Sequence, residues 1–368
     1  MTEKNPCMWK KPAPVMNKKM MKSKVLIIGG GVTGLVAAVS LDELGIDSII
    51  VEKEPELGGK VKKYSRVFPD FRSGKTIVRD LIAKIQKSSR VRAVVSTSVT
   101  SAERVNGWYV VTDSNDTQYK VKAIILACGF DVFDARCQDE YGYGVYPNVV
   151  NSLELEALLE AQDLQGSLLL RPSDGKPANK IALIFCVGSR SRRLGNPYCS
   201  RICCSYSTKQ AIEIIEKNPD ASVTCFYMDI RTYDRGFEEM YQYAQELGVK
   251  YVRGRVSECS AMSNGDIQVR AENTLLGKPV QGIYDIVSLS VGMMPCADAA
   301  DLAGMLGIER SEDGFFTRKD KFFSPHDTVK EGIFIAGSLT GLKPIKDCLL
   351  EGNSVSSRVA AYFSRYKS

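Results

Sequence analysis

The sequence has a single histidine among its 368 residues, His326. It follows Pro325 in a polar stretch, which predicts a surface loop, so acid–base catalysis by a histidine has no support. The two cysteine motifs of flavin disulfide reductases are also lacking, because no C-x-x-C occurs between residues 178 and 284 and no C-x-x-x-x-C follows Gly58 and Gly59. A redox dithiol built from two neighbouring cysteines is therefore not expected.

Long apolar runs are lacking as well, and no segment approaches the roughly eighteen uninterrupted apolar residues that would predict a membrane span. Residues 1–23 are rich in Lys, Met and Pro without the apolar stretch of a signal peptide, which predicts a flexible basic tail. The net charge of +6 is small and no basic stripe is interleaved with aromatic residues, so nucleic-acid binding is not expected. Eleven cysteines without an export signal favour a reducing, cytoplasmic setting over a disulfide framework.

One glycine-rich turn stands in the context that a dinucleotide requires. A buried strand is expected over residues 25–28, followed by G-G-G-V-T-G at residues 29–34 and a helical pattern over residues 35–44. Such a turn brings the backbone and a helix N-terminus close to a pyrophosphate. A second strand over residues 48–51 ends at an acidic residue, about 20 positions on, where a carboxylate meets a ribose hydroxyl. The contacts predicted here are Gly29, Gly31, Val32, Thr33, Gly34 and Glu52.

Four further segments indicate which dinucleotide binds. Residues 52–60 resemble the E-x-x-x-x-x-G-G run of FAD-binding oxidoreductases, and residues 123–129 and 285–292 resemble their A-T-G crossings. Residues 332–338 resemble their C-terminal G-D strand, with a serine in place of the aspartate. Together and in this order the segments favour FAD over NAD. The FAD contacts that they add are Lys53, Gly58, Gly59, Lys60, Ala127, Cys128, Gly129, Gly337, Ser338 and Asp347.

Four cysteines stand where a second glycine-rich turn is expected. A strand over residues 181–185 ends at the first of them, and only Gly188 follows from a G-x-G-x-x-G pattern. The other three fall on the turn before the next helix and on its first residues. The four are Cys186, Cys199, Cys203 and Cys204.

Four converging thiolates suit either an iron–sulfur cluster or a structural zinc. Uncoordinated thiols, including a Cys203–Cys204 disulfide, are the third alternative. A [4Fe–4S] cluster is favoured because it would lie beside a flavin, and because zinc usually takes two short C-x-x-C knuckles. Four other cysteines in or beside apolar runs are predicted to be ordinary core residues: Cys128, Cys225, Cys259 and Cys348.

These landmarks predict an α/β flavoprotein with two dinucleotide-binding domains, of which the second is modified to hold the cluster. Residues 91–121 are expected to form a smaller strand-rich part of the first domain. The expected division is a tail over 1–23, the first part of the FAD-binding domain over 24–165, a linker over 166–177, an inserted Rossmann-like domain with the cysteines over 178–284, and the return to the FAD-binding domain over 285–368.

The segments around the cysteines carry a more specific resemblance. R-P-S-D-G-K at residues 171–176, C-V-G-S-R at 186–190 and Y-C-S-R-I-C-C at 198–204 resemble the signature of the family formed by the A subunits of heterodisulfide reductases. G-Y-G-V-Y-P-N at residues 142–148 resembles another block of that family. The resemblance implies a thioredoxin-reductase-like fold, FAD, and a [4Fe–4S] cluster on the four cysteines. It also implies that Lys209 lies near the flavin, the alternative being a solvated helix lysine.

The same resemblance implies partners and a role. The chain has no ferredoxin-like cysteine repeats, so it resembles the short core form in the heterodisulfide reductase-like complex of sulfur oxidisers, and secondly the A subunit of the quinone-interacting complex of sulfate reducers. The expected role is electron transfer between flavin and iron–sulfur partner subunits, by a homodimer in the cytoplasm, with thiol or disulfide chemistry on the partners. A stand-alone NAD(P)H-dependent flavoenzyme and a zinc-bearing scaffold are the alternatives.

Overall fold

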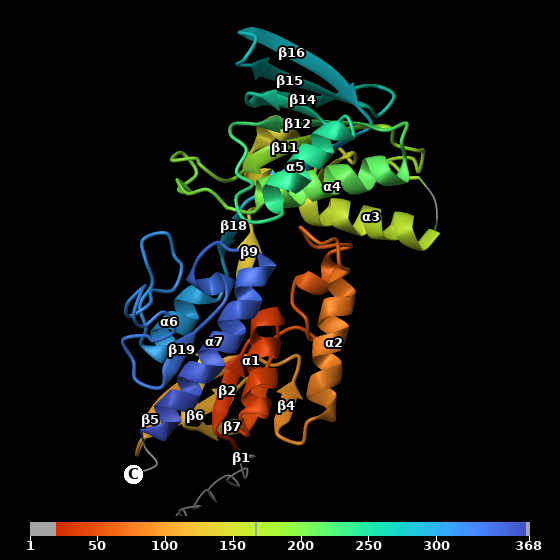
Figure 1. Cartoon of the computed structure of the whole chain (residues 1–368). Coiled ribbons are helices and arrows are strands. Elements are labelled where there is room, and N and C mark those ends of the chain that lie inside the picture. The colour runs from red at the N-terminus through yellow and green to blue at the C-terminus, as the bar shows by residue number, and fades with distance from the viewer. Residues whose placement is uncertain (1–19, 166–167, 366–368) are drawn as a thin grey trace, which may run out of the picture.

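The computed structural model describes residues 20–165 and 168–365 (Figure 1). The molecule has two parts, and the first part is formed by the N-terminal and C-terminal segments of the described chain. At its centre lies a five-stranded parallel sheet in the order β19-β8-β2-β3-β4. Its strands are β2 (Val25–Ile28), β3 (Ser48–Val51), β4 (Val91–Val94), β8 (Ala123–Leu126) and β19 (Ile333–Ile335). All but the edge strand β4 are buried along their whole length, as a sheet covered on both faces requires. The two strands expected before and after the glycine-rich turn are confirmed.

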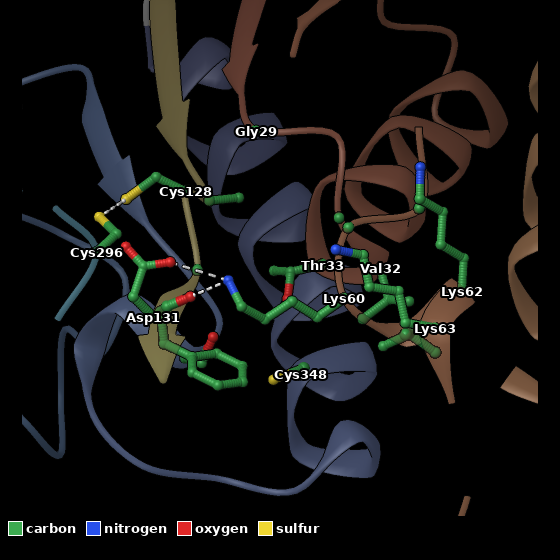
Figure 2. Close-up of a pocket in the computed structure, with 18 of the residues that line it drawn as sticks. Gly29, Val32, Thr33, Lys60, Lys62, Lys63, Cys128, Asp131, Cys296 and Cys348 are labelled. Carbon is green, nitrogen blue, oxygen red and sulfur yellow. Dashed lines mark hydrogen bonds and ion pairs between the residues drawn. The ribbon is translucent and has the colours of Figure 1, made fainter. Parts of the chain in front are cut away.

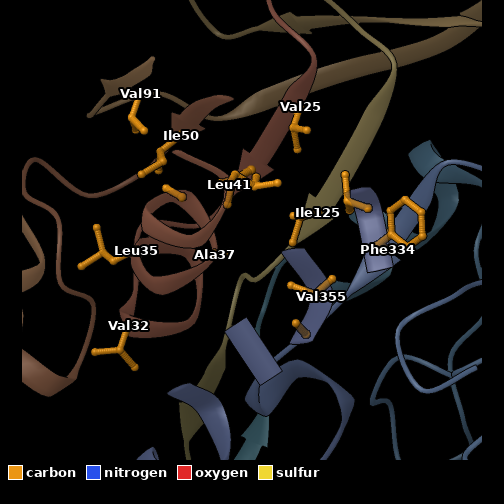
Figure 3. Packing of buried hydrophobic residues seen from close by; sticks show 14 of the residues in the cluster. Val25, Val32, Leu35, Ala37, Leu41, Ile50, Val91, Ile125, Phe334 and Val355 are labelled. Atoms are coloured by element: carbon orange, nitrogen blue, oxygen red, sulfur yellow. The ribbon is translucent and has the colours of Figure 1, made fainter. Parts of the chain in front are cut away.

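Three helices cover one face of this first sheet. They are α1 (Val32–Glu43), α2 (Gly74–Lys87) and α7 (Ile345–Ser364). Alternate strand side chains such as Val25 and Ile125 point into this face and pack with Leu35 and Val355 of the helices (Figure 3). All four side chains are fully buried, and each contributes about 1.5–3 kcal/mol to folding through the apolar surface that it removes from water.

A smaller sheet and one helix cover the other face. The elements are β1 (Met20–Lys22), β5 (Val99–Val105), β6 (Trp108–Asp113) and β7 (Gln118–Val121), in the order β1-β7-β6-β5, and α6 (Ala299–Leu306). Leu26 and Ile124 of the large sheet pack here with Val111 and Tyr119. The expected strand-rich part is confirmed, except that β4 belongs to the large sheet. Residues 20–22 of the expected tail form a strand, and Ser23 after it donates its amide to the Lys120 carbonyl oxygen at 3.3 Å. Residues 1–19 of that tail lie outside the described residues.

The remaining part repeats this three-layer plan around a second parallel sheet, in the order β10-β17-β11-β12-β13. Its strands are β10 (Val149–Asn151), β11 (Lys180–Val187), β12 (Ser222–Tyr227), β13 (Lys250–Arg253) and β17 (Ile286–Val291). One face packs against the helices α3 (Ser152–Gln165), α4 (Cys203–Lys217) and α5 (Phe237–Glu246). The other face packs against an antiparallel sheet of β14 (Val256–Ala261), β15 (Ile267–Asn273) and β16 (Lys278–Tyr284). The expected strand–helix–strand order around the cysteines is confirmed.

Two short antiparallel strands, β9 (Phe130–Val132) and β18 (Met293–Pro295), lie between the two parts (Figure 1). They mark where the chain leaves the first part and where it returns. The expected boundaries at 165 and 285 are therefore wrong, because β10 and α3 already belong to the second part and β17 is still a strand of its sheet. Strand pairing across the sheet, which a local pattern does not show, sets these boundaries.

The segment expected as a linker is anchored to the second part. Leu170 and Pro177 form an isolated bridge. Between them the Arg171 guanidinium is buried and donates to the Asp266 carboxylate at 2.6 Å. Short 3-10 turns complete the described chain: η1 (Val61–Lys63), η2 (Ala135–Cys137), η3 (Asp139–Tyr141) and η4 (Ser338–Thr340). Over residues 20–165 and 168–365, no helix has both the length and the apolar character needed to cross a membrane.

The single histidine is not on the surface, so that expectation is wrong. His326 is 4% exposed, and its Nε2 lies 2.9 Å from the Ser354 hydroxyl while its Nδ1 lies 3.2 Å from the Ile335 carbonyl oxygen. Burial lowers the pKa of this imidazole, which favours its neutral form. A polar segment was expected to be solvated, but here it packs onto the end of β19.

Candidate functional site

The glycine-rich turn joins β2 to α1 through only three residues, 29–31. Gly29 has a φ of +111°, and a Cβ added there would lie 2.4 Å from the Ala127 carbonyl oxygen on the neighbouring strand. A Cβ at Gly34 would lie 2.0 Å from the Gly29 carbonyl oxygen, so this glycine allows helix and strand to pack closely. Gly31 is different, because a Cβ there would meet no atom within 4 Å. It borders an open cavity at the N-terminus of α1.

Glu52 ends β3 beside this turn. Its carboxylate is buried and accepts hydrogen bonds from the Gly30 amide at 2.5 Å and the Glu54 amide at 2.9 Å. A carboxylate has about four lone-pair positions, so two backbone donors leave room for hydroxyl donors from a ligand. The acidic side chain thus stands where the sequence predicted a ribose contact.

The paired glycines Gly58 and Gly59 and the following Lys60 form another wall of the same cavity, next to the glycine-rich turn. Gly58 donates its amide to the Gly30 carbonyl oxygen at 2.8 Å. The Lys60 ammonium donates to the Phe130 carbonyl oxygen at 2.5 Å and to the Asp131 carboxylate at 3.0 Å (Figure 2). Burial opposes ionisation of Asp131, but hydrogen bonds from the Ala297 amide and Lys60 outweigh it and lower the pKa of this carboxyl.

The cavity has a volume of about 570 Å³ and is lined by both parts of the molecule. Such a volume is typical of cofactor sites, which range over about 300–1,000 Å³. The predicted residues that line it are Gly29, Gly31, Val32, Thr33, Glu52, Lys53, Gly58, Gly59, Lys60, Ala127, Cys128, Gly129, Ser338 and Lys209. The sequence reasoning missed others on its wall, among them Glu156, Tyr206, Lys343, Cys296 and Cys348. No local motif marks these, because they come from elements that only the fold brings together.

Three predicted contacts do not line the cavity: Gly34, Gly337 and Asp347. Gly337 packs on α1, where a Cβ would lie 2.5 Å from the Thr33 hydroxyl. Asp347, near the start of α7, forms an ion pair with Arg201 at 3.2 Å. Arg201 belongs to the connection that carries the cysteines, so this carboxylate joins the two parts.

One face of α4 lines the cavity, and it carries a buried cluster of charged side chains. Lys209 is 1% exposed and its ammonium lies 2.5 Å from Glu156 and 3.0 Å from Glu213. Burial would lower the pKa of Lys209, but the two carboxylates outweigh it and raise the pKa. Burial also raises the pKa of Glu213, against the effect of Lys209. The solvated alternative for Lys209 is therefore wrong, and its position on the cavity wall leaves the predicted flavin contact as a proposal.

The four cysteines predicted to bind the cluster lie at the end of β11, on residues 188–202 and at the start of α4. A hydrogen bond with Cys203 lowers the pKa of Cys186 to about 7 against the effect of burial. Hydrogen bonds with Cys186 and Cys204 raise the pKa of Cys203, so these three thiols form a chain. The fourth thiol, Cys199, accepts from the Arg201 amide at 3.3 Å.

The donor types suit a group held by four thiolates, because three thiols already contact one another and the fourth lies on the same connection. The arrangement itself is that of free cysteines. Among residues 20–165 and 168–365, no three histidine, cysteine or carboxylate side chains are placed to hold a metal ion. The cluster therefore remains a prediction from the sequence.

Four other cysteines were predicted to be core residues, and the structure confirms three of them. Cys225, Cys259 and Cys348 are buried, as expected of core residues. Cys128 was also assigned to the core, but it is only partly buried, and its sulfur lies 3.1 Å from that of Cys296 at the cavity wall (Figure 2).

Together, the fold and the glycine-rich site define a class of oxidoreductase. Residues 23–361 match the family described as pyridine nucleotide-disulphide oxidoreductase, and the chain belongs to this family. Thioredoxin reductase of T. acidophilum has the same fold, with a TM-score of 0.66 at 16% identity over 94% of this chain and 99% of that one. The predicted thioredoxin-reductase-like α/β fold is confirmed.

Within this class, the relatives are A subunits of heterodisulfide reductases. The second iron-sulfur A subunit of the CoB–CoM heterodisulfide reductase of Methanopyrus kandleri is 32% identical over an alignment that covers 92% of this chain and 64% of the relative. The A subunit of the H(2)/formate:CoB-CoM heterodisulfide,ferredoxin reductase of Methanococcus maripaludis is 42% identical over 248 residues, covering 67% of this chain and 38% of the relative. The predicted resemblance to the A subunits of heterodisulfide reductases is confirmed, although the chain spans less than two thirds of these relatives.

Proposed function

We propose that this chain is the FAD-binding and [4Fe–4S]-binding electron-transfer subunit of a heterodisulfide reductase-like complex that acts in sulfur-compound oxidation. The observation that carries the proposal is the position of α4. Its first residues, Cys203 and Cys204, belong to the four-cysteine set, while Tyr206 and Lys209, within its next two turns, line the large cavity of the first part. One helix therefore connects the two candidate cofactor sites.

The first part supplies the groups that an FAD needs. The N-terminus of α1 presents backbone amides to the cavity, and a helix N-terminus favours a pyrophosphate. Gly31 leaves the backbone open to close approach, and Glu52 presents a carboxylate held by two amides. Such contacts would hold an extended dinucleotide across the end of the first sheet.

The second part supplies thiol ligands in place of a second dinucleotide site. Its cavity at the end of β11, lined by Cys186 and Gly188, has a volume of about 20 Å³, far below the size of cofactor sites. This contrast favours a relay over a stand-alone NAD(P)H-dependent flavoenzyme. When bound, FAD supplies two-electron chemistry and a [4Fe–4S] cluster supplies one-electron chemistry.

Charged side chains of this chain lie beside both candidate cofactor sites. Lys209 keeps its proton at Nζ because Glu156 and Glu213 flank it, so a fixed positive charge stands on the cavity wall. Buried charges and hydrogen bonds of this kind tune the potential of a bound cofactor. The Asp347–Arg201 ion pair holds the cysteine-bearing connection against α7.

The proposal extends to the assembly. Iron–sulfur partner subunits would carry the thiol or disulfide chemistry, and we expect a homodimer of this chain in the cytoplasm. The relatives named above are subunits of heterodisulfide reductases, which supports a multi-subunit complex. Co-purification with the partners and sedimentation of the isolated chain measure these two points.

The test of the cofactor assignment is the iron, zinc and flavin content of anaerobically purified protein, with EPR spectra before and after reduction. We expect about four irons and one FAD per chain. Cys203→Ala should lose the iron and the EPR signal while it keeps the flavin. The matched control is Cys225→Ala, which removes a fully buried thiol from the adjacent strand β12.

Three outcomes would contradict the proposal. Flavin without iron in wild-type protein would remove the cluster, and stoichiometric zinc without flavin would favour a scaffold. Steady NADH oxidation by the isolated, iron-free chain would favour a stand-alone flavoenzyme.

A further inference from the structure

Two cysteines outside the four-cysteine set contact one another beside the β9–β18 strand pair that connects the two parts. The sulfur atoms of Cys128 and Cys296 are 3.1 Å apart, although 168 positions separate them in the sequence. Both side chains line the large cavity, and Figure 2 shows them facing one another beside Asp131. No sequence motif pairs these two cysteines, because the contact arises only from tertiary structure.

Their position in the fold is specific. Cys128 lies between β8 and β9, and Cys296 follows β18 directly. Phe130 pairs with Pro295 in the β9–β18 ladder, so the two thiols close the end of this ladder that faces the first part. A bond between them would tie together the two strands by which the chain leaves and re-enters the first part.

The environment makes this pair chemically different from the core cysteines. The hydrogen bond with Cys128 is the largest cause that lowers the pKa of Cys296, and nearby Lys53 acts in the same direction. Burial instead raises the pKa of Cys348 to about 11 and that of Cys259 to about 12. The hydrogen bond with Cys296, together with burial, raises the pKa of Cys128. A thiolate is the reactive form of cysteine, so Cys296 is the thiol of the pair that reacts first, and Cys128 lies beside it to complete the reaction.

We propose that Cys128 and Cys296 form a dithiol–disulfide site for low-molecular-weight disulfides, separate from the four-cysteine set. The thiolate of one cysteine attacks a sulfur of the small disulfide, forms a mixed disulfide and releases one small thiolate. The second cysteine then loses its proton, attacks the mixed disulfide and releases the second small thiolate. The two cysteines are oxidised by two electrons, and the small disulfide is reduced to two thiols.

Geometry supports the second step. Bond formation requires the sulfur atoms to approach from 3.1 Å to about 2.05 Å, a shift of roughly 1 Å. The ladder already holds the two segments side by side. Neither cofactor of the proposed function takes part in this exchange, although Cys128 is also a predicted FAD contact on the same cavity wall. The inference therefore goes beyond that function.

The test uses the chain as purified without oxygen, treated with 2-hydroxyethyl disulfide, alkylated with N-ethylmaleimide and mapped by peptide mass spectrometry. We expect a Cys128–Cys296 linked peptide, lighter by two hydrogens than the sum of the free peptides and reversed by dithiothreitol. Cys128→Ser and Cys296→Ser should lose the linked peptide, and the remaining cysteine of the pair should keep a hydroxyethylthio adduct. Cys259→Ser, which removes a buried thiol elsewhere, should still form the link.

Two results would overturn the proposal. One is full alkylation of both cysteines in treated wild-type protein. The other is a link that forms only after denaturation. Flavin and iron are measured in the same samples, so failure of the cofactor assignment and failure of this thiol site are separate results.

Discussion

The two large parallel sheets share one plan and differ in the connection between the central strand and the helix that follows it. Each has five strands, helices on one face and a smaller sheet on the other. In the first part β2 reaches α1 through residues 29–31, beside a cavity of about 570 Å³. In the second part β11 reaches α4 through residues 188–202, beside a cavity of about 20 Å³. The layers thus define a common frame, and the strand–helix connection decides how much space is left beside it at the end of each sheet.

The two helices that follow these connections, α1 and α4, also differ in which residues they bury. α1 is buried with apolar and small residues, which suits a helix whose function is to present its N-terminus. α4 carries Lys209 and Glu213 in its buried interior. The second helix therefore depends on charge balance, and the first depends on close backbone packing.

The largest expected effect tests that charge balance. Lys209→Met keeps an unbranched side chain that is one atom shorter, but it leaves Glu156 and Glu213 buried without their cation. We expect the free energy of unfolding to fall by about 3–5 kcal/mol in urea titrations. Lys346→Met, which removes an exposed ion pair with Asp234, is the control and should stay close to wild type. Equal losses in the two variants would contradict the assigned role of the buried cluster.

The pH dependence of the same variant has a definite sign. Burial raises the pKa of Glu213 in the folded state, and loss of Lys209 removes the cause that opposes it. A carboxyl with a raised folded pKa stabilises at low pH and loses that contribution as the pH rises through the folded value. Lys209→Met should therefore be less stable at pH 8 than at pH 5. In wild type Lys209 opposes the rise in the pKa of Glu213 and keeps its own proton over this whole range, so wild type should show a smaller loss than the variant.

A smaller effect is expected from the glycine turn of the first part. Gly29→Ala places a Cβ 2.4 Å from the Ala127 carbonyl oxygen at a φ of +111°, which should cost about 3 kcal/mol through strain and displacement of the strand. Flavin retention on gel filtration and thermal unfolding measure the outcome. Gly45→Ala shares a positive φ but meets no atom within 4 Å, so it should keep its flavin. Flavin retention by both variants would show that the turn tolerates a side chain.

Next in size is the acidic residue that ends β3. Glu52→Gln replaces one acceptor oxygen by a donor that faces a backbone amide, either that of Gly30 or that of Glu54. An unsatisfied buried donor costs about 1–3 kcal/mol, and we expect roughly a tenfold loss of FAD affinity in equilibrium titrations of the apoprotein, equivalent to about 1.4 kcal/mol. Glu43→Gln, on the exposed end of α1, should bind FAD as wild type does. Unchanged affinity in Glu52→Gln would remove this residue from the site.

The smallest effect concerns acid stability of the first part. Burial would raise the pKa of Glu351, but Lys343 and Arg318 outweigh it and lower the pKa. Such a carboxyl stabilises above its unfolded pKa, about 4.3, and loses that contribution as the pH falls through the folded value. Glu351→Gln should therefore flatten the acid limb of the unfolding free energy by about 1 kcal/mol. Parallel acid limbs for the variant and wild type would contradict this assignment.

Sequence reasoning succeeded where one short segment contains both the pattern and its physical cause. The turn at Gly29 and the strand ending at Glu52 were predicted because a strand, a glycine turn and a helix follow one another directly. It failed at His326, whose polar neighbours predicted exposure although the side chain packs against β19 and α7. The prediction of the domain boundaries failed for a related reason, because β10 and β17 are neighbours in the sheet although they lie far apart in the sequence.

The sequence by itself determined the class of fold, the glycine turn and the presence of four thiols around one strand–helix connection. These follow from residue type and spacing along a single element. Only the tertiary structure decided that Lys209 is buried between two carboxylates, that Asp347 binds Arg201, and that Cys128 contacts Cys296. The reason is physical: burial, charge pairing and thiol contact depend on which distant segments the folded core places side by side, and no local pattern records that placement.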